Sequence, residues 1–464
     1  MKKKIGVIIC LVLLAVTVVT AFSACDDAGA SGKKITVRFV TGFDDIVIDA
    51  VVLTADERQP FPDDPIKVGY DFCGWYYDEE FQRKFALTDA LTEDTTLYAK
   101  FEKKTVDFPD KPGEKPEIDE KTGFTFKLSE DETYYSVVSY NGNEKQVVIP
   151  AVFNGKAVKR IARETFGTND LINGINISSK AEDIEPGLFA GCSELNAISV
   201  TAGNAKYTSH GGVLYAKGSR KIVAVGRKKV DSGNAFVVDE ETVSIAEYAF
   251  AGCDFKVELP KNSSFNVLTE RCFAEYDGEV TLGKNIEEIR KQAFYEATCK
   301  VVFDAECALS ELTNGAFDGY KGEKLVFVSA LNSVSECAFN DCTAELDFSA
   351  CGLKSLGDRA LYGYTGKAFV VPFSVKTIGS GCFYGSSATV TFEQNSIYEE
   401  VGENAFMGFK GEVVFPETVK SVRDYAFYAC ESGAKIRFLA FKEQIALSPK
   451  AMDGSGKATV TYGK

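Results

Sequence analysis

The C-terminal two thirds of the chain repeat one arrangement of apolar and polar positions. An apolar residue stands five positions before a phenylalanine or another large apolar residue, with mostly polar residues and one small residue between them. Twelve copies occur, and outside one long interval they recur every 21 to 25 residues. Such a period predicts a solenoid, because one coil cannot bury its apolar face alone whereas a stack of coils shares a continuous core. The paired positions are Ile161/Phe166, Ile184/Phe189, Ile245/Phe250, Leu268/Phe273, Ile289/Phe294, Leu312/Phe317, Val334/Phe339, Leu356/Leu361, Ile378/Phe383, Val401/Phe406, Val422/Phe427 and Leu447/Met452.

Short stretches between these pairs alternate apolar and polar residues, which predicts strands with one buried face. We expect one short strand per coil, stacked in parallel on its neighbours. The expected inward pairs are Val257/Leu259, Val280/Leu282, Val301/Phe303, Leu325/Phe327, Leu346/Phe348, Phe369/Val371, Val390/Phe392, Val413/Phe415, Ile436/Phe438 and Val460/Tyr462.

The outward residues of these strands form a row that is a candidate contact surface. Four valines and only three charged residues make the row apolar for an open sheet face, and apolar surface patches are often binding sites. The alternative is that valine stands there only for its strand propensity. The row comprises Glu258, Thr281, Val302, Val326, Asp347, Val370, Thr391, Val414, Arg437 and Thr461.

A second alternation lies three residues after the phenylalanine position, where rings and small side chains take turns. Close packing favours large side chains opposite small ones in facing layers. A pair of coils is therefore the expected unit. The alternating residues are Tyr276, Ala297, Tyr320, Cys342, Tyr364, Ser386, Phe409 and Cys430.

These repeats resemble those of the BspA-like leucine-rich repeat family, whose coils read roughly LxxIxIPxxVxxIGxxAFxxC. Residues 204–226 are also similar to an insertion that these proteins often carry. We place the solenoid at 122–464 and the insertion at about 204–235, which accounts for the long interval between Phe189 and Phe250. The resemblance implies a mainly β, leucine-rich-repeat fold and the binding of host or matrix proteins and other bacteria.

The first 25 residues have the order of an export signal: three lysines, an apolar run and small residues before Cys25. The run is short for a membrane span, which needs about 20 apolar residues. The motif FSAC resembles the bacterial lipobox, whose cysteine is lipidated. We predict a signal peptide at 1–24, lipidation of Cys25, a flexible tether at 25–33 and anchoring to the outer face of the cell membrane through lipid alone. The alternative is an ordinary signal peptide with an incidental Cys25.

Residues 34–104 form a separate aromatic-rich segment. The stretches GYDFCGWYYDEEF and TLYAKF resemble the Listeria–Bacteroides repeat, also called the internalin B-type repeat, which implies a small β-grasp-like module. In so short a unit the aromatic residues are needed for a core, and this role is favoured over a sugar-binding platform. Residues 105–121 are rich in proline and charge and predict a semi-rigid linker.

Composition limits the chemistry of the chain. A net charge of −15 over 464 residues disfavours nucleic acid and anionic lipid headgroups as partners. The one histidine, His210, lies in the insertion, and no GxSxG motif accompanies it. The sequence has no clustered ligands of the kind that zinc requires. We therefore expect no enzymatic activity, cofactor or metal site, and a monomer.

Most of the 13 cysteines fall in register with the repeats, which predicts small buried thiols rather than disulfides. If a bridge exists, Cys337 and Cys342 are the favoured pair, because they share one coil.

Two functions remain from the sequence. The first is a bacterial cell-surface scaffold that binds an extracellular protein or glycan without catalysis. The alternative is a structural spacer, or an accessory lipoprotein of a system that handles envelope polysaccharide.

Overall fold

A computed structural model describes residues 34–43, 48, 50–54, 65, 70–85, 91, 93–103, 115–230, 234–455 and 458–463. The chain divides into two compact units, 1–107 and 108–464. The predicted signal peptide, Cys25 and the tether at 25–33 lie outside the described residues.

The N-terminal unit is a four-stranded sheet in the order β2-β1-β4-β3. Its strands are β1 (Lys34–Val40), β2 (Val51–Thr54), β3 (Tyr70–Tyr76) and β4 (Thr95–Lys103). The central pair β1 and β4 is parallel and the outer pairs are antiparallel. Trp75, Phe85 and Leu97 are buried in its core, as expected for aromatic residues that stabilise a small unit. The described residues of this unit contain no helix, and the β-grasp-like topology stays a prediction.

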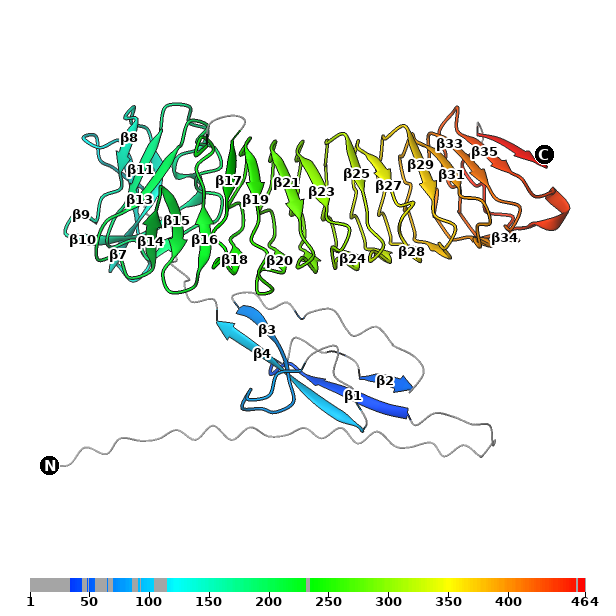
Figure 1. Cartoon of the computed structure of the whole chain (residues 1–464), viewed down its shortest axis with the longest axis horizontal. Coiled ribbons are helices and arrows are strands. Elements are labelled where there is room, and N and C mark those ends of the chain that lie inside the picture. The colour runs from blue at the N-terminus through cyan, green and yellow to red at the C-terminus, as the bar shows by residue number, and fades with distance from the viewer. Residues whose placement is uncertain are drawn as a thin grey trace. The chain divides into compact units, whose positions relative to one another are not determined.

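The second unit is an elongated stack of coils in which two rows of parallel strands run along its length (Figure 1). This arrangement confirms the predicted leucine-rich-repeat solenoid. Each coil contains a first strand, a second strand of mostly two residues, and a turn that carries the phenylalanine, which we call the ring position. The first strands are β8 (Gln146–Val148), β11 (Gly174–Ile177), β13 (Ala197–Val200), β17 (Ala235–Val237), β19 (Lys256–Glu258), β21 (Glu279–Leu282), β23 (Lys300–Phe303), β25 (Lys324–Val326), β27 (Glu345–Asp347), β29 (Ala368–Val371), β31 (Thr389–Phe392), β33 (Glu412–Phe415), β35 (Lys435–Phe438) and β37 (Thr459–Tyr462).

The second strands form the other row and were not distinguished by the sequence pattern. Each except β16 ends on the apolar residue that stands five positions before the ring position. They are β10 (Lys156–Ile161), β12 (Asp183–Ile184), β16 (Lys221–Ala224), β18 (Ser244–Ile245), β20 (Val267–Leu268), β22 (Glu288–Ile289), β24 (Glu311–Leu312), β26 (Ser333–Val334), β28 (Ser355–Leu356), β30 (Thr377–Ile378), β32 (Glu400–Val401), β34 (Ser421–Val422) and β36 (Ala446–Leu447). Two short 3-10 helices, η1 (Arg163–Thr165) and η2 (Lys442–Gln444), complete the coils.

Antiparallel strands close the N-terminal end of the stack. They are β5 (Glu117–Ile118), β6 (Phe124–Leu128), β7 (Tyr134–Tyr140) and β9 (Val152–Phe153). Strand β5 pairs with β6, so that Glu117 lies opposite Phe126. This pairing corrects the predicted linker at 105–121, because residues 117 and 118 belong to the sheet of the second unit. The prolines and charges of that segment hid so short a strand.

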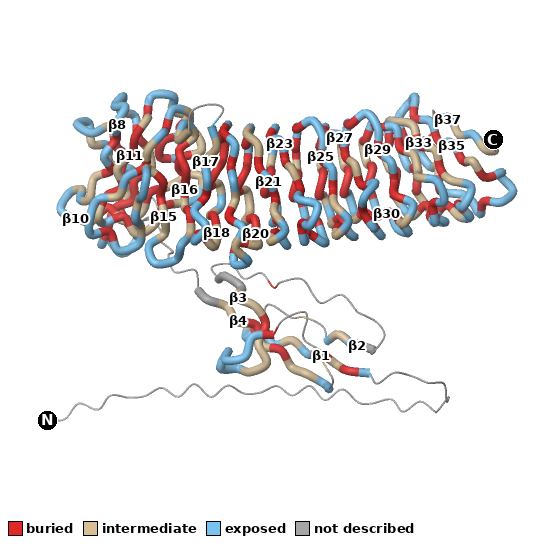
Figure 2. Tube along the Cα trace, in the orientation of Figure 1, coloured by how far each residue is buried: buried red, intermediate tan, exposed pale blue. Residues whose placement is uncertain are grey.

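The rings stack through the middle of the second unit. The centroids of Phe250 and Phe273 are 5.2 Å apart, those of Phe273 and Phe294 are 5.4 Å apart, and those of Phe294 and Phe317 are 5.0 Å apart, with planes within 11° of parallel. Figure 2 shows buried residues recurring along the whole stack. The predicted inward strand residues are buried except Leu259, Phe392, Val460 and Tyr462, which are half-buried.

In the nine consecutive coils from Phe250 to Phe427, the turn around the ring position has a left-handed residue two positions before the ring and another two positions after it. Both conformations are strained for residues other than glycine. In nine consecutive coils, from Phe250 to Phe427, the ring-position N–H donates to the carbonyl that precedes the next ring position. The positive-φ residues are Gly187, Tyr248, Arg271, Gln292, Gly315, Cys337, Arg359, Gly381, Asn404 and Tyr425 before the ring, and Gly252, Glu275, Glu296, Gly319, Asp341, Gly363, Gly385, Gly408, Ala429 and Gly454 after it.

The predicted alternation of rings and small side chains is confirmed, since all eight positions are buried. In three coils a tyrosine hydroxyl reaches back to a main-chain carbonyl of the preceding coil. The Tyr276 hydroxyl donates to the Phe255 carbonyl at 2.6 Å, and Tyr320 donates to Cys299 at 2.5 Å. Burial raises the pKa of these hydroxyls, so they stay protonated and donate.

The long interval between Phe189 and Phe250 contains a complete coil, whose second strand and ring position lie within the predicted insertion at about 204–235. Strand β13 is its first strand and β16 its second, with Ile222 paired to Ile245 of β18. Val225 takes the ring position, because its N–H donates to the Ala249 carbonyl at 2.9 Å. The sequence pattern missed this coil since valine replaces phenylalanine and stands three residues after Ile222 rather than five.

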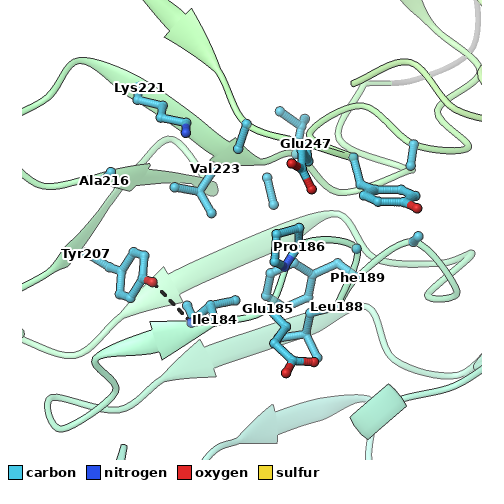
Figure 3. Close-up of a pocket in the computed structure, with 17 residues that line it drawn as sticks. Ile184, Glu185, Pro186, Leu188, Phe189, Tyr207, Ala216, Lys221, Val223 and Glu247 are labelled. Carbon is cyan, nitrogen blue, oxygen red and sulfur yellow. Dashed lines mark hydrogen bonds between the residues drawn. The ribbon is translucent and has the colours of Figure 1, made fainter. Parts of the chain in front are cut away.

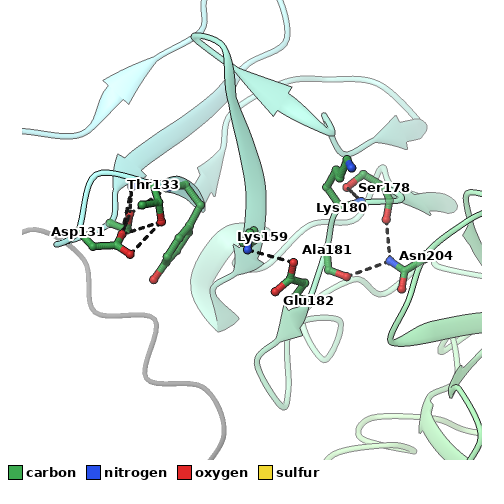
Figure 4. Close-up of polar contacts among 10 residues, drawn as sticks. Asp131, Thr133, Lys159, Ser178, Lys180, Ala181, Glu182 and Asn204 are labelled. Atoms are coloured by element: carbon green, nitrogen blue, oxygen red, sulfur yellow. Dashed lines mark hydrogen bonds and ion pairs between the residues drawn. The ribbon is translucent and has the colours of Figure 1, made fainter. Parts of the chain in front are cut away.

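The inserted part of this coil is a hairpin of β14 (Tyr207–His210) and β15 (Val213–Ala216). Strand β15 pairs antiparallel with β16, and the Tyr207 hydroxyl accepts a hydrogen bond from the Ile184 N–H at 3.1 Å. The buried side chain of Asn204 donates to the Ser178 and Ala181 carbonyls at 2.8 and 2.9 Å (Figure 4). The insertion is thus tied to the preceding coil at its base.

We expect Phe317→Ala to lower the free energy of unfolding by about 3–5 kcal/mol, because it removes a fully buried ring that stacks on two neighbours. Chemical denaturation measures the loss. Phe373→Ala is the control, since Phe373 is 52% exposed and its loss should change stability by about 0.5 kcal/mol or less. A cost below about 1 kcal/mol for Phe317→Ala would contradict the role of the stack.

The turn geometry gives a second prediction from a matched pair of positions two residues after the ring. Ala429 has φ 53° and Gly385 has φ 67°, and a Cβ on Gly385 would contact nothing within 4 Å. Ala429→Gly should therefore stabilise the protein by about 0.5–1 kcal/mol and Gly385→Ala should destabilise it by about 1 kcal/mol. Equal effects of the two changes in thermal unfolding would rule out backbone conformation as their cause.

Candidate interaction surface

The structure places the ten residues of the predicted row side by side along the first strands. Glu258, Thr281 and Val302 lie in one sheet, Val326 and Asp347 in a second, and the other five in a third. Val237 extends the row by one position, because it pairs with Glu258 and is 66% exposed. The sequence analysis omitted Val237 because it follows the insertion, where the repeat spacing is lost.

The valines of the row are not equally accessible. Val326 and Val370 are 49% and 46% exposed, whereas Val302 and Val414 are half-buried. The expectation of four exposed valines is therefore wrong for two of them. Accessible apolar surface on the row is concentrated around β25 and β29 in its middle part.

A groove crosses the row where β27 and β29 separate. These consecutive first strands are not hydrogen-bonded to each other, whereas β29, β31, β33, β35 and β37 form one continuous sheet. The groove has a volume of about 510 Å³. Its lining includes two members of the predicted row, Asp347 and Val370. Glu323, Glu345, Lys367 and Glu393 contribute charged side chains to it.

A tyrosine hydroxyl lies where the strands separate, as the Tyr320 hydroxyl does between the unpaired strands β23 and β25. Strands β19 and β21 stay paired beside the equivalent Tyr276 hydroxyl. The Tyr364 hydroxyl lies 2.9 Å from the Ala344 carbonyl and 3.4 Å from the Ala368 carbonyl, the residues at the starts of β27 and β29. The hydroxyl therefore joins the two chain segments in place of a main-chain N–H. In the coil where Phe409 takes this position there is no hydroxyl, and β31 and β33 pair over three residues.

The groove is predominantly acidic. Lys324 bridges Glu345 at 2.7 Å and Asp347 at 3.1 Å across one wall. Hydrogen bonds from the Ser349 side chain and main chain lower the pKa of Asp347, so this carboxylate stays charged. Glu393 accepts a hydrogen bond from the Phe373 N–H at 2.9 Å. Four carboxylates against Lys324 and Lys367 favour cationic or hydroxyl-rich ligands.

Two exposed apolar side chains lie outside the groove lining, in loops whose main chain bonds to Glu393 or to each other, and the strand pattern did not predict them. Phe373 is 52% exposed and Ile397 is 44% exposed. The Ile397 N–H donates to the Phe373 carbonyl at 3.0 Å, which places the two on adjacent coils. They lie in the loops after β29 and β31, outside the strand alternation on which the predicted row was based.

The cysteines of the described solenoid are free thiols, and all but Cys337 are buried. Burial raises the pKa of Cys342 to about 12 and that of Cys430 to about 11. Such thiols are poor nucleophiles at neutral pH. His210 is exposed in β14, and no cluster of three potential metal ligands occurs among the residues that the structure describes.

No helix in the described part of the chain is both long and apolar enough to span a membrane.

The fold defines a leucine-rich-repeat solenoid with a groove across one sheet face. The family model of the BspA type leucine rich repeat region matches this chain in six copies, at residues 144–211, 229–346 and 354–446. These ranges cover more than half of the 464 residues, and the protein therefore belongs to the BspA-type leucine-rich repeat family. The Listeria-Bacteroides repeat domain matches residues 36–100, within the N-terminal unit.

No curated protein matches the chain. Among solved structures, a leucine rich cell surface protein from Faecalibacterium prausnitzii is 16% identical, with 76% of this chain and 96% of that chain covered and a TM-score of 0.32. A leucine-rich repeat protein from Bacteroides ovatus is 17% identical, with 75% and 99% covered and a TM-score of 0.30. These scores are low, and the family assignment rests on the repeat matches.

Proposed function

We propose that the protein is a bacterial cell-surface lipoprotein that binds an extracellular protein or glycan without catalysis. The observation that carries this proposal is the groove between β27 and β29, which lies on the predicted row of a leucine-rich-repeat protein. Its volume of about 510 Å³ is within the range of ligand-binding clefts, about 300–1,000 Å³. Exposed apolar residues and fixed charges occur together there, as at specific binding sites.

The polarity of the groove supports recognition rather than simple adhesion to apolar surfaces. Val370 on the floor and Phe373 beside it offer apolar contact, while Asp347 and Glu345 are held by Lys324. A ligand with ammonium, guanidinium or hydroxyl groups beside an apolar part would satisfy both features. Such ligands include basic peptide segments and glycans.

Binding to protein and glycan arrays tests the proposal, using the full-length protein. Val370→Glu should reduce binding at least about tenfold, because it places a fifth carboxylate in the groove beside the apolar contact. Val326→Glu should have a smaller effect, since Val326 lies on the row outside the groove lining.

Thr281→Glu is the matched control, because Thr281 is exposed on the same row several coils away. Unchanged binding in all three variants would exclude the row as the binding surface. If the wild-type protein bound nothing on either array, the structural spacer, or an accessory lipoprotein of an envelope polysaccharide-handling system, would be the better interpretation.

Lipid anchoring is a separate part of the proposal and rests on the FSAC motif. In a bacterial host that processes lipoproteins, the wild-type protein should incorporate labelled palmitate and partition into detergent. Cys25→Ser should abolish the label and release the protein, because two or more acyl chains are needed for stable anchoring. A wild-type protein recovered without acylation would contradict this part alone.

A further inference from the structure

A cavity of about 220 Å³ lies beside the coil that the sequence pattern missed. One wall is the turn of the preceding coil, with Glu185, Pro186 and Leu188 (Figure 3). The opposite wall is the turn of the following coil, which includes Glu247 and Tyr248. The cavity is on a different strand row from the groove, and nothing in the proposed function depends on it.

A deficit of two residues produces the cavity. The ring position Phe250 stands five positions after Ile245, but Val225 stands only three positions after Ile222. The segment from Val223 to Val225 therefore makes a shorter turn than the turns on either side. Val223, Ala224 and Val225 line the cavity where two further residues would stand in a regular coil.

The wall formed by the preceding turn has main-chain donors without a partner among the described residues. In nine coils the ring-position N–H bonds to the next coil, but among the described residues neither the Phe189 N–H nor the Gly187 N–H has an acceptor. Within the same described part of the chain, the ring-position N–H of Phe166 also has no acceptor in the next coil, and the main-chain N–H groups of Arg271 and Asn404, which are equivalent to that of Gly187, have none. The cavity beside the Phe189 turn is what distinguishes its two donors. The acceptor expected from the pattern is the Ala224 carbonyl, and Ala224 pairs instead with Leu214 of the hairpin. Phe189 is a buried residue, and unpaired N–H groups at such positions are rare.

A side-chain bridge links the flanking turns. The Arg227 Nε donates to the Gly252 carbonyl at 2.7 Å, and its Nη1 donates to the Ala190 carbonyl at 3.2 Å. The guanidinium thus spans the two coils at the place where a regular turn would join them. Arg163 also stacks over the Tyr248 ring at 4.8 Å. The two walls also approach each other at Gly187, where an added Cβ would lie 3.4 Å from the Tyr248 ring.

We propose that this cavity is a binding site for a short extended peptide segment of another protein. Two peptide carbonyls would accept from the Gly187 and Phe189 N–H groups and so replace the missing part of the turn. One apolar side chain of the peptide would lie against Ile184, Leu188 and Val223. Main-chain hydrogen bonds would supply affinity and the apolar floor would supply selectivity, as in strand addition to a sheet edge.

Hydrogen exchange on the full-length protein tests the unpaired donors. The Phe189 amide should exchange at least about a hundredfold faster than the equivalent Phe294 amide, which donates to the Ala316 carbonyl at 3.1 Å. Electron-transfer fragmentation of peptides that cover the two turns gives the rates at single residues. Equal protection of Phe189 and Phe294 in the free protein would overturn the proposal.

A phage-displayed library of random heptapeptides, selected on the full-length protein, tests the ligand class. Ala216→Trp fills the cavity from β15, and Thr208→Trp places the same side chain on the exposed face of β14 as a control. A selected peptide should lose at least about tenfold in affinity on Ala216→Trp, keep its affinity for Thr208→Trp, and slow exchange at Phe189. Selection of no peptide, or only of peptides indifferent to Ala216→Trp, would overturn it.

Val370→Glu separates this site from the groove. Peptide binding at the cavity should be unchanged in that variant, because Val370 lies on the other strand row. A peptide that loses affinity only on Val370→Glu would be bound in the groove, and this result would contradict peptide binding in the cavity.

Discussion

The structure depends on the contact between successive ring positions. Flat rings stack face to face at 5.0–5.7 Å from Phe250 to Phe339, close to the spacing of about 4.8 Å between neighbouring strands. From Phe250 to Phe339 one ring per coil therefore fills the core at the same rise at which the main chain forms its hydrogen bonds. Because these two spacings match, the same turn conformation can recur in successive coils.

The turn that carries the ring has a conformational cost. Two left-handed residues flank the ring position in nine coils, and many of them are not glycine, including Gln292, Glu296 and Arg359. The hydrogen bond from the ring-position N–H to the next coil offsets this conformational strain. Stability in such a stack is a sum of contacts between neighbours, so a departure in one coil disturbs only the junctions that it shares.

Both candidate sites arise at junctions where the regular contact is altered. At the groove, the Tyr364 hydroxyl takes the place of a main-chain donor and the two first strands separate. At the cavity, one turn is two residues short and the Phe189 N–H in the preceding turn has no partner among the described residues. In each case the flanking coils keep their packing, which is why a solenoid can carry a recognition feature without losing its core.

The repeat period, the inward strand residues and the alternation of rings with small side chains could be predicted because each is a local pattern that the core imposes in every coil. By contrast, the coil centred on Val225 was missed, because a valine three residues after Ile222 carries no trace of the common pattern. The pattern also marked Val302 and Val414 as outward without indicating that they are half-buried. Outward direction follows from alternation along one strand, whereas exposure depends on the side chains of neighbouring strands.

The sequence by itself determined that this chain forms stacked coils and which residues enter their shared core, since burial demands the same residue types at the same spacing each time. Only the tertiary structure decided where the surface opens. The separation of β27 from β29 and the gap beside Val225 depend on which donor meets which acceptor between coils, and those partners stand about 20 or more residues apart in the chain.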